Sequence, residues 1–471
     1  MTVDPLATST TRVGLVCATL RARIESRALA KGARLPSVRR LSEELAVSKS
    51  TVVEAYDRLA AEGLVEARRG AGFFVAAPPQ PFVLAQAPRL DPAVDLLSIV
   101  RAAMEERPDE IQPASGWLPE DWLPSEGVDR SVRAVLRGPS KSKLRYDSPF
   151  GYEPLRRLIA ARMGERGIPV DPARVVLTDS TTQALDLALR FHVRAGDRVA
   201  LDDPRYFNLG QLVGAHRAEL VSVPYTREGP DLDALERVFA ESRPRVYVAL
   251  SGPHNPTGAT LSAATAHRVL TLAEKYDVVV IEDDIYGDFE ANPSPRLAAF
   301  DGFSRVIYVG GFTKTISAAL RVSYLIGRPD WMDAIVDLKL ATTLGSSAFA
   351  AAAVHAYLAE GGYRRHLEAM RVKLAHATTH ALTRLKRLGL KPWVEPRAGA
   401  FIWAELPDGL DAALVARAGQ RDRVVFAPGR MFSASPQWHG FMRFNVAVSA
   451  DLRVFEALER AMVAVRRNEI V

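Results

Sequence analysis

The chain has 471 residues, of which 48 % are hydrophobic and 25 % are charged, so it is an ordinary globular protein long enough for two or three domains. Its one cysteine, Cys17, excludes an internal disulfide framework and a four-cysteine metal site, and we therefore expect a reducing, cytoplasmic compartment and assign no metal site. No apolar run is long enough to span a membrane, and the first sixteen residues lack the pattern of a signal peptide.

Positive charge is concentrated near the beginning of the chain. Residues 1–78 carry 12 Lys and Arg against 8 Asp and Glu, a net of +4 out of a total of +6. A basic module of this kind indicates an anionic partner such as nucleic acid. The alternative is general arginine richness, because the rest of the chain is rich in arginine too.

Residues 10–75 alternate helical patterns with sharp breaks. A first helix is predicted over about 10–29, Pro36 and Ser37 open a short second helix, and Ser48 is expected to cap a third over about 49–62. The stretch "LVEARRGAGFFV" then predicts two short strands joined by a Gly-x-Gly turn. The expected apolar positions of the three helices are Val13, Leu15, Val16, Leu20 and Ile24; Leu41 and Leu45; and Val52, Ala55, Tyr56 and Leu59.

This order of elements is the layout of a winged helix-turn-helix. The third helix would enter the major groove with its first residues facing the duplex, while arginines of the second helix and of the wing would meet phosphates or groove edges. The alternatives are a helical bundle with solvated arginines and a winged helix that docks a protein. The candidate DNA contacts are Arg39, Arg40, Lys49, Ser50, Thr51, Arg68, Arg69, Gly70 and Gly72.

A proline-rich stretch follows and resists both helix and sheet. We predict a winged helix-turn-helix over 1–77, a linker over 78–110 with a helix near 93–106, and one large domain over 111–471. In the large domain, "RVVLT", "RVALD", "RVYVAL", "VVVIEDD" and "VIYVGG" are short, apolar and β-branched, and helical patterns separate them. They predict an α/β fold with a mainly parallel sheet covered on both faces.

Lys314 lies in "VGGFTKTISAALRVSYLIG", a segment whose composition indicates burial. A buried amine is useful when it forms a Schiff base with an aldehyde, and pyridoxal phosphate (PLP) is the cofactor that offers one. That cofactor needs a carboxylate at its ring nitrogen, donors at its phenolic oxygen, and an arginine with a helix N-terminus at its phosphate.

Each of these needs has a candidate along the chain, although each residue alone is ordinary loop, turn or packing chemistry. The candidates are Asp283 for the ring nitrogen; Tyr286 and Asn255 for the phenolic oxygen; Arg321, Ser180, Thr181 and Thr182 for the phosphate; Tyr206 for stacking on the ring; Tyr146 for a phosphate, in a neighbouring subunit; and Arg443 for the carboxylate of a substrate or effector.

Two family resemblances follow from these residues. "LPSVRRLSEELAVSKSTVVEAYDRLAAEGLVEARRGAGFFVA" resembles the DNA-binding domain of GntR-type bacterial regulators, with Lys49 where that family usually has arginine. The order of Ser180, Tyr206, Asn255, Asp283, Tyr286, Lys314, Arg321 and Arg443 resembles fold-type I PLP enzymes of the aspartate-aminotransferase superfamily over about 110–465.

The second resemblance implies that Lys314 is the aldimine lysine and that a smaller C-terminal α/β subdomain follows the main sheet. Two positions depart from the pattern: Gly311 replaces a usual Ser or Thr, and Ser180 replaces a usual Gly. Both departures are expected to weaken cofactor affinity or to shift the pose of the cofactor.

Together the two halves resemble the MocR subfamily of bacterial regulators. That resemblance implies a PLP-dependent transcription regulator that binds double-stranded DNA and senses PLP or an amine or amino-acid effector at Lys314. It also implies a homodimer, often domain-swapped, and no membrane association. The alternative is an active PLP-dependent aminotransferase with an appended DNA-binding domain.

Overall fold

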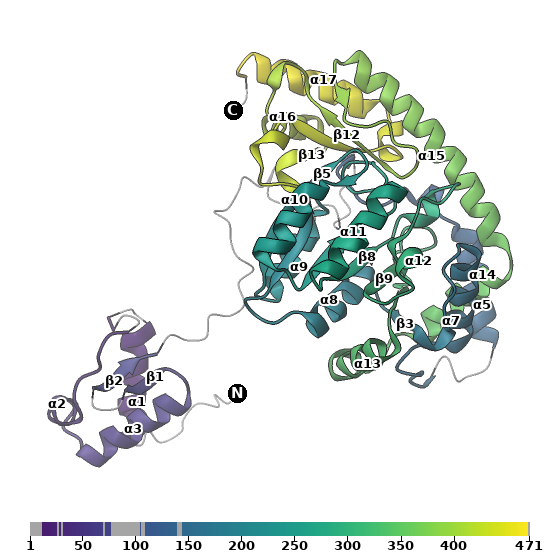
Figure 1. Ribbon diagram of the computed structural model, residues 1–471. Coiled ribbons are helices and arrows are strands. Elements are labelled where there is room, and N and C mark those ends of the chain that lie inside the picture. The colour runs from purple at the N-terminus through teal and green to yellow at the C-terminus, as the bar shows by residue number, and fades with distance from the viewer. Residues whose placement is uncertain are drawn as a thin grey trace, which may run out of the picture. The chain divides into compact units, whose positions relative to one another are not determined.

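The structure is a computed structural model that describes residues 12–25, 28–29, 32–68, 71–76, 104, 109–138 and 144–469. The chain divides into two compact units, Met1–Val83 and Leu84–Val471, and each is described by itself (Figure 1). The predicted helix near 93–106 and nearly all of the predicted linker lie outside the described residues, as do Arg69 and Gly70 of the wing.

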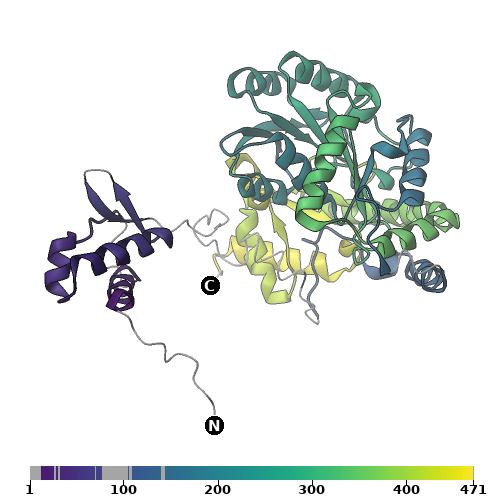
Figure 2. The ribbon, with the colours of Figure 1, turned by 90° about the horizontal axis from the view of Figure 1, so that it is seen from below.

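The N-terminal unit contains the predicted three helices and two strands. They are α1 Arg12–Glu25, α2 Val38–Glu44, α3 Lys49–Ala61, β1 Val65–Arg68 and β2 Gly72–Val75, and the two strands form an antiparallel hairpin that is plain in Figure 2. Both predicted caps are confirmed. The Ser37 hydroxyl accepts a hydrogen bond from the Arg40 N–H at 3.2 Å, and the Ser48 hydroxyl accepts one from the Thr51 N–H at 3.1 Å.

The predicted apolar faces form the core of this unit, with one exception. All four predicted residues of α3 are buried, and the Tyr56 hydroxyl donates to the Pro36 carbonyl at 2.6 Å. Leu15 was expected inside but is 51 % exposed, whereas Cys17 is buried. The prediction was wrong there because a helix turns about 100° per residue, and the face centred on Val16 and Leu20 leaves Leu15 outside.

The large unit is built on an eight-stranded sheet with the order β3-β10-β9-β8-β7-β4-β5-β6. All its strands run the same way except β10 and β6. The five predicted strands are present, while the antiparallel β10, inserted between β3 and β9, was not predicted. The bounds are β3 Val175–Thr178, β4 Arg198–Asp203, β5 Glu219–Thr226, β6 Gly229–Pro230, β7 Val246–Ala249, β8 Val279–Asp283, β9 Val306–Gly311 and β10 Ser323–Ile326.

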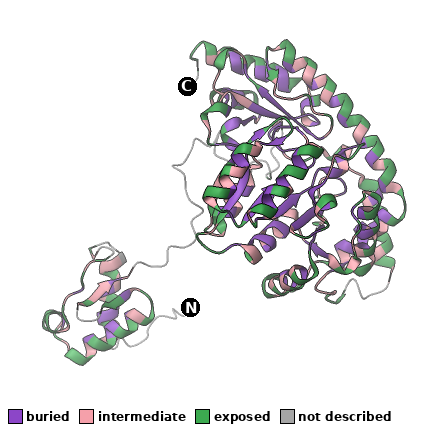
Figure 3. Ribbon diagram, in the orientation of Figure 1, coloured by how far each residue is buried: buried purple, intermediate pink, exposed green. Residues whose placement is uncertain are grey.

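Helices cover both faces of this sheet, and the central strands are mostly buried (Figure 3). On one face α8, α9 and α13 pack against residues such as Val176, Val309 and Leu325. The other face is covered by α7, α10, α11 and α12. The bounds are α7 Glu153–Glu165, α8 Thr181–His192, α9 Phe207–Ala215, α10 Leu232–Arg237, α11 Ala263–Lys275, α12 Leu297–Asp301 and α13 Pro329–Thr343.

A smaller C-terminal subdomain contains the antiparallel sheet β11-β12-β14-β13 and two helices. The long helix α15 runs along the outside of the large unit and reaches this subdomain (Figure 1). The bounds are α5 Ser125–Arg137, α14 Ala348–Ala359, α15 Gly362–Arg387, β11 Lys391–Pro392, β12 Phe401–Glu405, α16 Ala412–Gly419, β13 Ala427–Pro428, β14 Phe441–Asn445 and α17 Arg453–Arg466. Within the ranges given above, no helix is both long and apolar enough to cross a membrane.

Candidate active site and nucleic-acid interface

A cavity of about 360 Å³ lies where the parallel strands of the large unit end. Parallel strands bring their carboxyl ends to one edge of the sheet, so residues far apart in sequence meet there. Tyr146 does not belong to it within one chain, since its side chain is 83 % exposed on the surface. The predicted residues that line the cavity are Ser180, Thr181, Thr182, Tyr206, Asn255, Asp283, Tyr286, Lys314, Arg321 and Arg443.

Lys314 follows β9 and points its amine into the cavity. The Nζ atom donates to the Gly116 carbonyl at 2.7 Å, and among the described residues it forms no ion pair. The pKa of Lys314 is lowered to about 8, chiefly by burial and next by the nearby guanidinium of Arg443, while Asp283 acts in the opposite direction. A substantial fraction of the amine is therefore neutral, and so nucleophilic, near pH 8.

Two adjacent aspartates end β8 in different environments. Asp284 is engaged, because its Oδ2 atom lies 2.8 Å from Arg296 Nε and accepts a hydrogen bond from the Tyr308 hydroxyl at 2.6 Å. Asp283 lines the cavity, and its Oδ1 atom accepts only a long hydrogen bond of 3.3 Å from the Ile285 N–H in the described chain. Burial raises the pKa of Asp283 to about 7, because no cation touches it to hold the charged form.

Arg443, on β14, is fully buried and forms no ion pair with any described acidic residue. Its guanidinium donates to the carbonyls of Ala114 and Ser115 and, at 2.8 Å, to Asn255 Oδ1, and its Nε atom has no hydrogen-bond partner in the described structure. It also lies 4.4 Å from the centre of the Phe401 ring. A buried cation held only by neutral groups is suited to bind an anion.

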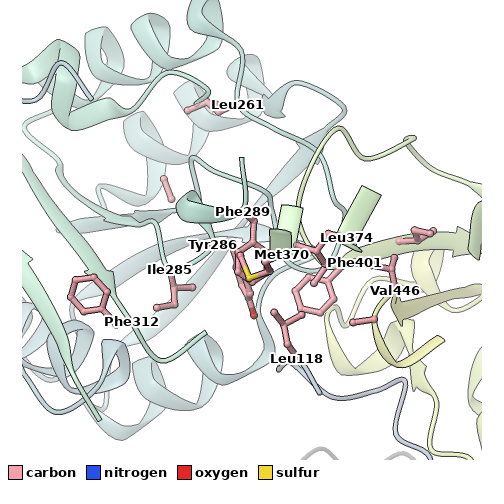
Figure 4. Close-up of a cluster of buried hydrophobic side chains, with 14 of the residues drawn as sticks. Leu118, Leu261, Ile285, Tyr286, Phe289, Phe312, Met370, Leu374, Phe401 and Val446 are labelled. Atoms are coloured by element: carbon pink, nitrogen blue, oxygen red, sulfur yellow. The ribbon is translucent and has the colours of Figure 1, made fainter. Parts of the chain in front are cut away.

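Arg443 also orients the amide of Asn255. Because Asn255 Oδ1 accepts from Arg443, its Nδ2 group is the donor that faces Tyr286. Burial raises the pKa of Tyr286, while the hydrogen bond from Asn255 lowers it. The Tyr286 ring is held edge-on against Phe289 and Phe401, at 5.5 and 5.3 Å between ring centres (Figure 4). Both donors are thereby fixed in the cavity.

Residues 111–117 form a strap that closes one side of the cavity. Backbone hydrogen bonds join it to the C-terminal subdomain, from Ala114 N–H to the Val425 carbonyl at 3.0 Å and from Asn445 N–H to the Pro113 carbonyl at 3.0 Å. The Asn445 side chain donates to the carbonyls of Ser115 at 3.2 Å and Trp117 at 2.7 Å. Lys314 and Arg443 also donate hydrogen bonds to this strap, Lys314 to the Gly116 carbonyl and Arg443 to the carbonyls of Ala114 and Ser115.

The first turn of α8 borders the same cavity. The Ser180 hydroxyl caps this helix by accepting a hydrogen bond from the Gln183 N–H at 3.0 Å. The serine that replaces the usual glycine at position 180 therefore has a structural role. The backbone N–H groups of Thr181 and Thr182 lie in the first turn, where an α-helix has no internal acceptor for them. They form a site for an anion, next to Arg321 in the cavity wall.

Sequence reasoning missed several residues of the cavity wall, among them Ile285, Gly116 and Asn208. Ile285 lies between two predicted residues, and its position in "DDIYG" was a usable signal. Gly116 acts through its carbonyl, which every residue carries, so no sequence signal marks it. Asn208, after β4, also lines the cavity and reads as an ordinary helix-start residue.

In the N-terminal unit, the predicted basic DNA contacts that the structure describes lie on the surface, and some of them pair with an acidic side chain. Lys49 is exposed at the first position of α3. Arg39 is 80 % exposed and pairs with Glu43 at 3.1 Å, a contact worth little in water. Arg68 pairs with Glu66 and lies 4.5 Å from the centre of the Phe74 ring.

The remaining predicted contacts have local structural roles. The hydroxyls of Ser50 and Thr51 hydrogen-bond the Ser48 hydroxyl at 2.8 and 2.7 Å, within the cap of α3. Arg40 is exposed. Gly72 has a φ of +102°, which favours glycine, and a side chain there would also meet Arg34.

Two family models match the chain, one in each unit. Residues 14–75 match "Bacterial regulatory proteins, gntR family", and residues 124–460 match "Aminotransferase class I and II".

Curated relatives share both parts. The HTH-type transcriptional regulator YdcR of Escherichia coli is 30 % identical over 440 residues, covering 91 % of this chain and 93 % of its own. The probable rhizopine catabolism regulatory protein MocR of Rhizobium meliloti is 29 % identical over 434 residues, covering 89 % and 87 %. Among solved structures, LysN, an alpha-aminoadipate aminotransferase of Thermus thermophilus complexed with N-(5'-phosphopyridoxyl)-L-leucine, has a TM-score of 0.72 at 29 % identity over 79 % of this chain and 95 % of its own.

The pKa of Lys314 gives a first prediction. The rate at which Lys314 reacts with the aldehyde of pyridoxal phosphate should rise from pH 7 to 9 and level off above that, because the amine is already mostly neutral above its pKa of about 8. The measurement is stopped-flow absorbance across that range, with Lys314→Arg as the unreactive control. A rate that keeps rising towards pH 10.5, the usual value for lysine, would show that burial does not lower this pKa.

Proposed function

The chain belongs to the MocR-type regulators, in which a GntR-family module precedes a class I and II aminotransferase domain, and from this premise we propose that it is a PLP-dependent regulator of transcription. Its N-terminal unit would bind double-stranded DNA, and its cavity would bind the cofactor together with a small amine or amino acid. One observation carries the proposal: a lysine amine and an unpaired buried guanidinium share a cavity whose strap continues into the linker.

The residues of the cavity fit the cofactor. Asp283 is a buried carboxylate without a cation, which suits the ring nitrogen, and the first turn of α8 with Arg321 suits the phosphate. Asn255 and Tyr286 are oriented donors for the phenolic oxygen. When bound, the cofactor supplies an aldehyde for the Lys314 amine and a ring that withdraws electrons.

Arg443 would recognise the effector by its carboxylate. A carboxylate pairs better with a buried guanidinium than carbonyl oxygens do, since charge-assisted hydrogen bonds are about twice as strong as neutral ones. A carboxylate that replaced the carbonyls of Ala114 and Ser115 at Arg443 would free both carbonyls. A cofactor held at Lys314 would remove the bond from Lys314 to the Gly116 carbonyl, which also accepts from the Tyr286 hydroxyl at 3.3 Å. Binding at the site would therefore weaken the hold on three strap carbonyls.

The strap offers a path from the cavity to the DNA-binding unit. It begins at Ile111, directly after the predicted linker over 78–110, so a shift of residues 111–117 would move the end of that linker. Such coupling requires the effector to have different affinities for the two positions of the strap. A homodimer would complete the arrangement, with the exposed Tyr146 of one chain entering the cavity of the other.

Transamination is a second candidate function. It is favoured by a lysine whose pKa of about 8 suits proton transfer and by its position in one cavity with Asp283 and Arg443. Incubation of the PLP-loaded protein with amino acids and a keto acid separates the two. Sustained production of a new keto acid, far faster than with free PLP, would favour the enzyme.

The regulator proposal predicts the outcome of genomic DNA selection. At fixed salt, the purified protein should recover a few specific sites, with enrichment that depends on PLP. Lys314→Ala should recover the same sites without that dependence, because the DNA-binding unit is untouched. Recovery of only salt-sensitive, sequence-independent DNA in both forms would contradict the proposal.

Lys49 provides a test of the DNA-binding face. Lys49→Ala should weaken binding to a selected site by at least about tenfold, because the residue begins the helix expected in the major groove. The measurement is a fluorescence-anisotropy titration at constant salt. Arg58→Ala is the matched control, as it removes an equal charge from the far end of the same helix and should change affinity by less than about threefold. Equal losses would indicate nonspecific charge attraction instead.

The strap predicts a further result. Asn445→Ala removes the side-chain bonds to Ser115 and Trp117, each worth about 1 kcal/mol, and should speed amide exchange in residues 111–117 by roughly five- to thirtyfold. If the strap transmits the signal, DNA affinity of the PLP-free variant should move towards that of the loaded wild-type protein. Faster exchange with unchanged DNA affinity would remove the strap from the coupling.

A further inference from the structure

Ser323 carries a buried hydroxyl at the start of β10, a strand inside the main sheet. It is the first residue of β10, two positions after Arg321, and its relative exposure is 0 %. Its Oγ atom has no hydrogen-bond partner in the described structure. Burying a hydroxyl in this way costs free energy, so such a group two positions from a residue of the cavity wall is a candidate ligand.

The register of the sheet places this hydroxyl beside the candidate phosphate site. Ser323 pairs with Thr178 on β3 and with Gly311 on β9. Paired residues on neighbouring strands face the same side of a sheet, and so do residues two positions apart along one strand. The residues two positions away from these three are Val176, Leu325 and Val309, and they pack on the side covered by α8. Ser323 therefore points to the side from which the first turn of α8 borders the cavity.

Gly311 and Ser323 compete for one space. A Cβ atom built on Gly311 would lie 2.4 Å from Ser323 Oγ and 2.9 Å from Ser323 Cβ, closer than real side chains approach. The Ser323 hydroxyl thus fills the position to which a side chain at 311 would point. Gly311 ends β9 three residues before Lys314, so this position lies next to the start of the loop that carries the lysine.

We propose that Ser323 Oγ supplies a hydrogen bond to the cofactor phosphate, in the space that Gly311 leaves open, beside Arg321 and the N-terminus of α8. This inference rests on the proposed function, because it needs PLP in the cavity. A phosphate oxygen would accept a hydrogen bond from the Ser323 hydroxyl, which has no partner in the described structure. The same hydroxyl would take the place of a side chain at Gly311. It also makes 311 and 323 one unit, in which the hydroxyl can come from either strand but not from both.

The test compares PLP with pyridoxal, which has the same ring and aldehyde and no phosphate. Dissociation constants are measured by fluorescence titration for the wild-type chain, Ser323→Ala and the exchange variant Gly311→Ser/Ser323→Gly. Ser323→Ala should weaken PLP binding about tenfold or more and leave pyridoxal binding within about twofold, because only a bond to charged phosphate is lost. The exchange variant should recover PLP affinity to within about threefold of wild type.

Ser449→Ala is the matched control, since it removes another buried hydroxyl that has no partner in the described structure, at a position outside the paired strands β9 and β10. It should change neither constant. Equal weakening of PLP and pyridoxal by Ser323→Ala, or no weakening of either, would overturn the phosphate role. If the wild-type chain binds neither compound, the proposed function fails and this inference fails with it. Thermal unfolding of each variant identifies a loss that comes from misfolding.

Discussion

A buried guanidinium with no carboxylate beside it, that of Arg443, is the constraint on which the site depends. An isolated charge is costly to bury, and here two strap carbonyls, the amide of Asn255 and two aromatic rings share that cost. These contacts join β14, the loop after β7 and the strap at one point. The arrangement holds the cavity together without a ligand and leaves the cation available to an anion that can displace the carbonyls.

Burial also prepares the reactive groups by acting on acids and bases in opposite directions. It raises the pKa of Asp283 to about 7 and lowers that of Lys314 to about 8, so near neutral pH a larger fraction of each group is uncharged than in water. Neither group forms an ion pair among the described residues, although each favours the charged form of the other. A ligand that brings a ring cation and an aldehyde would satisfy both, whereas the neighbouring Asp284 is already neutralised by Arg296 and serves the framework.

Each of the two units has a hydrophobic core of its own, and the covalent chain joins them. The N-terminal unit has its own core around Val52 and Leu59 and its own helix caps, so it needs nothing from the large unit to be folded. The strap follows the predicted linker directly in sequence, and Lys314 and Arg443 hold the strap and would also hold the proposed ligands. In the proposed function, coupling would come from competition between the strap carbonyls and the ligands for these two residues.

The sequence by itself determined the winged helix-turn-helix, its caps, five strands of the main sheet and the set of residues that converge on one cavity, because period, capping and strand ends are local properties. Tertiary structure decided the rest. The antiparallel β10 and the pairing of Gly311 with Ser323 depend on contacts across strands, and no local pattern specifies them. The Gly116 carbonyl is a backbone group without a sequence signature. Tyr146 is exposed on the surface of its own chain. The sequence shows that a tyrosine stands at this position but not where its side chain points.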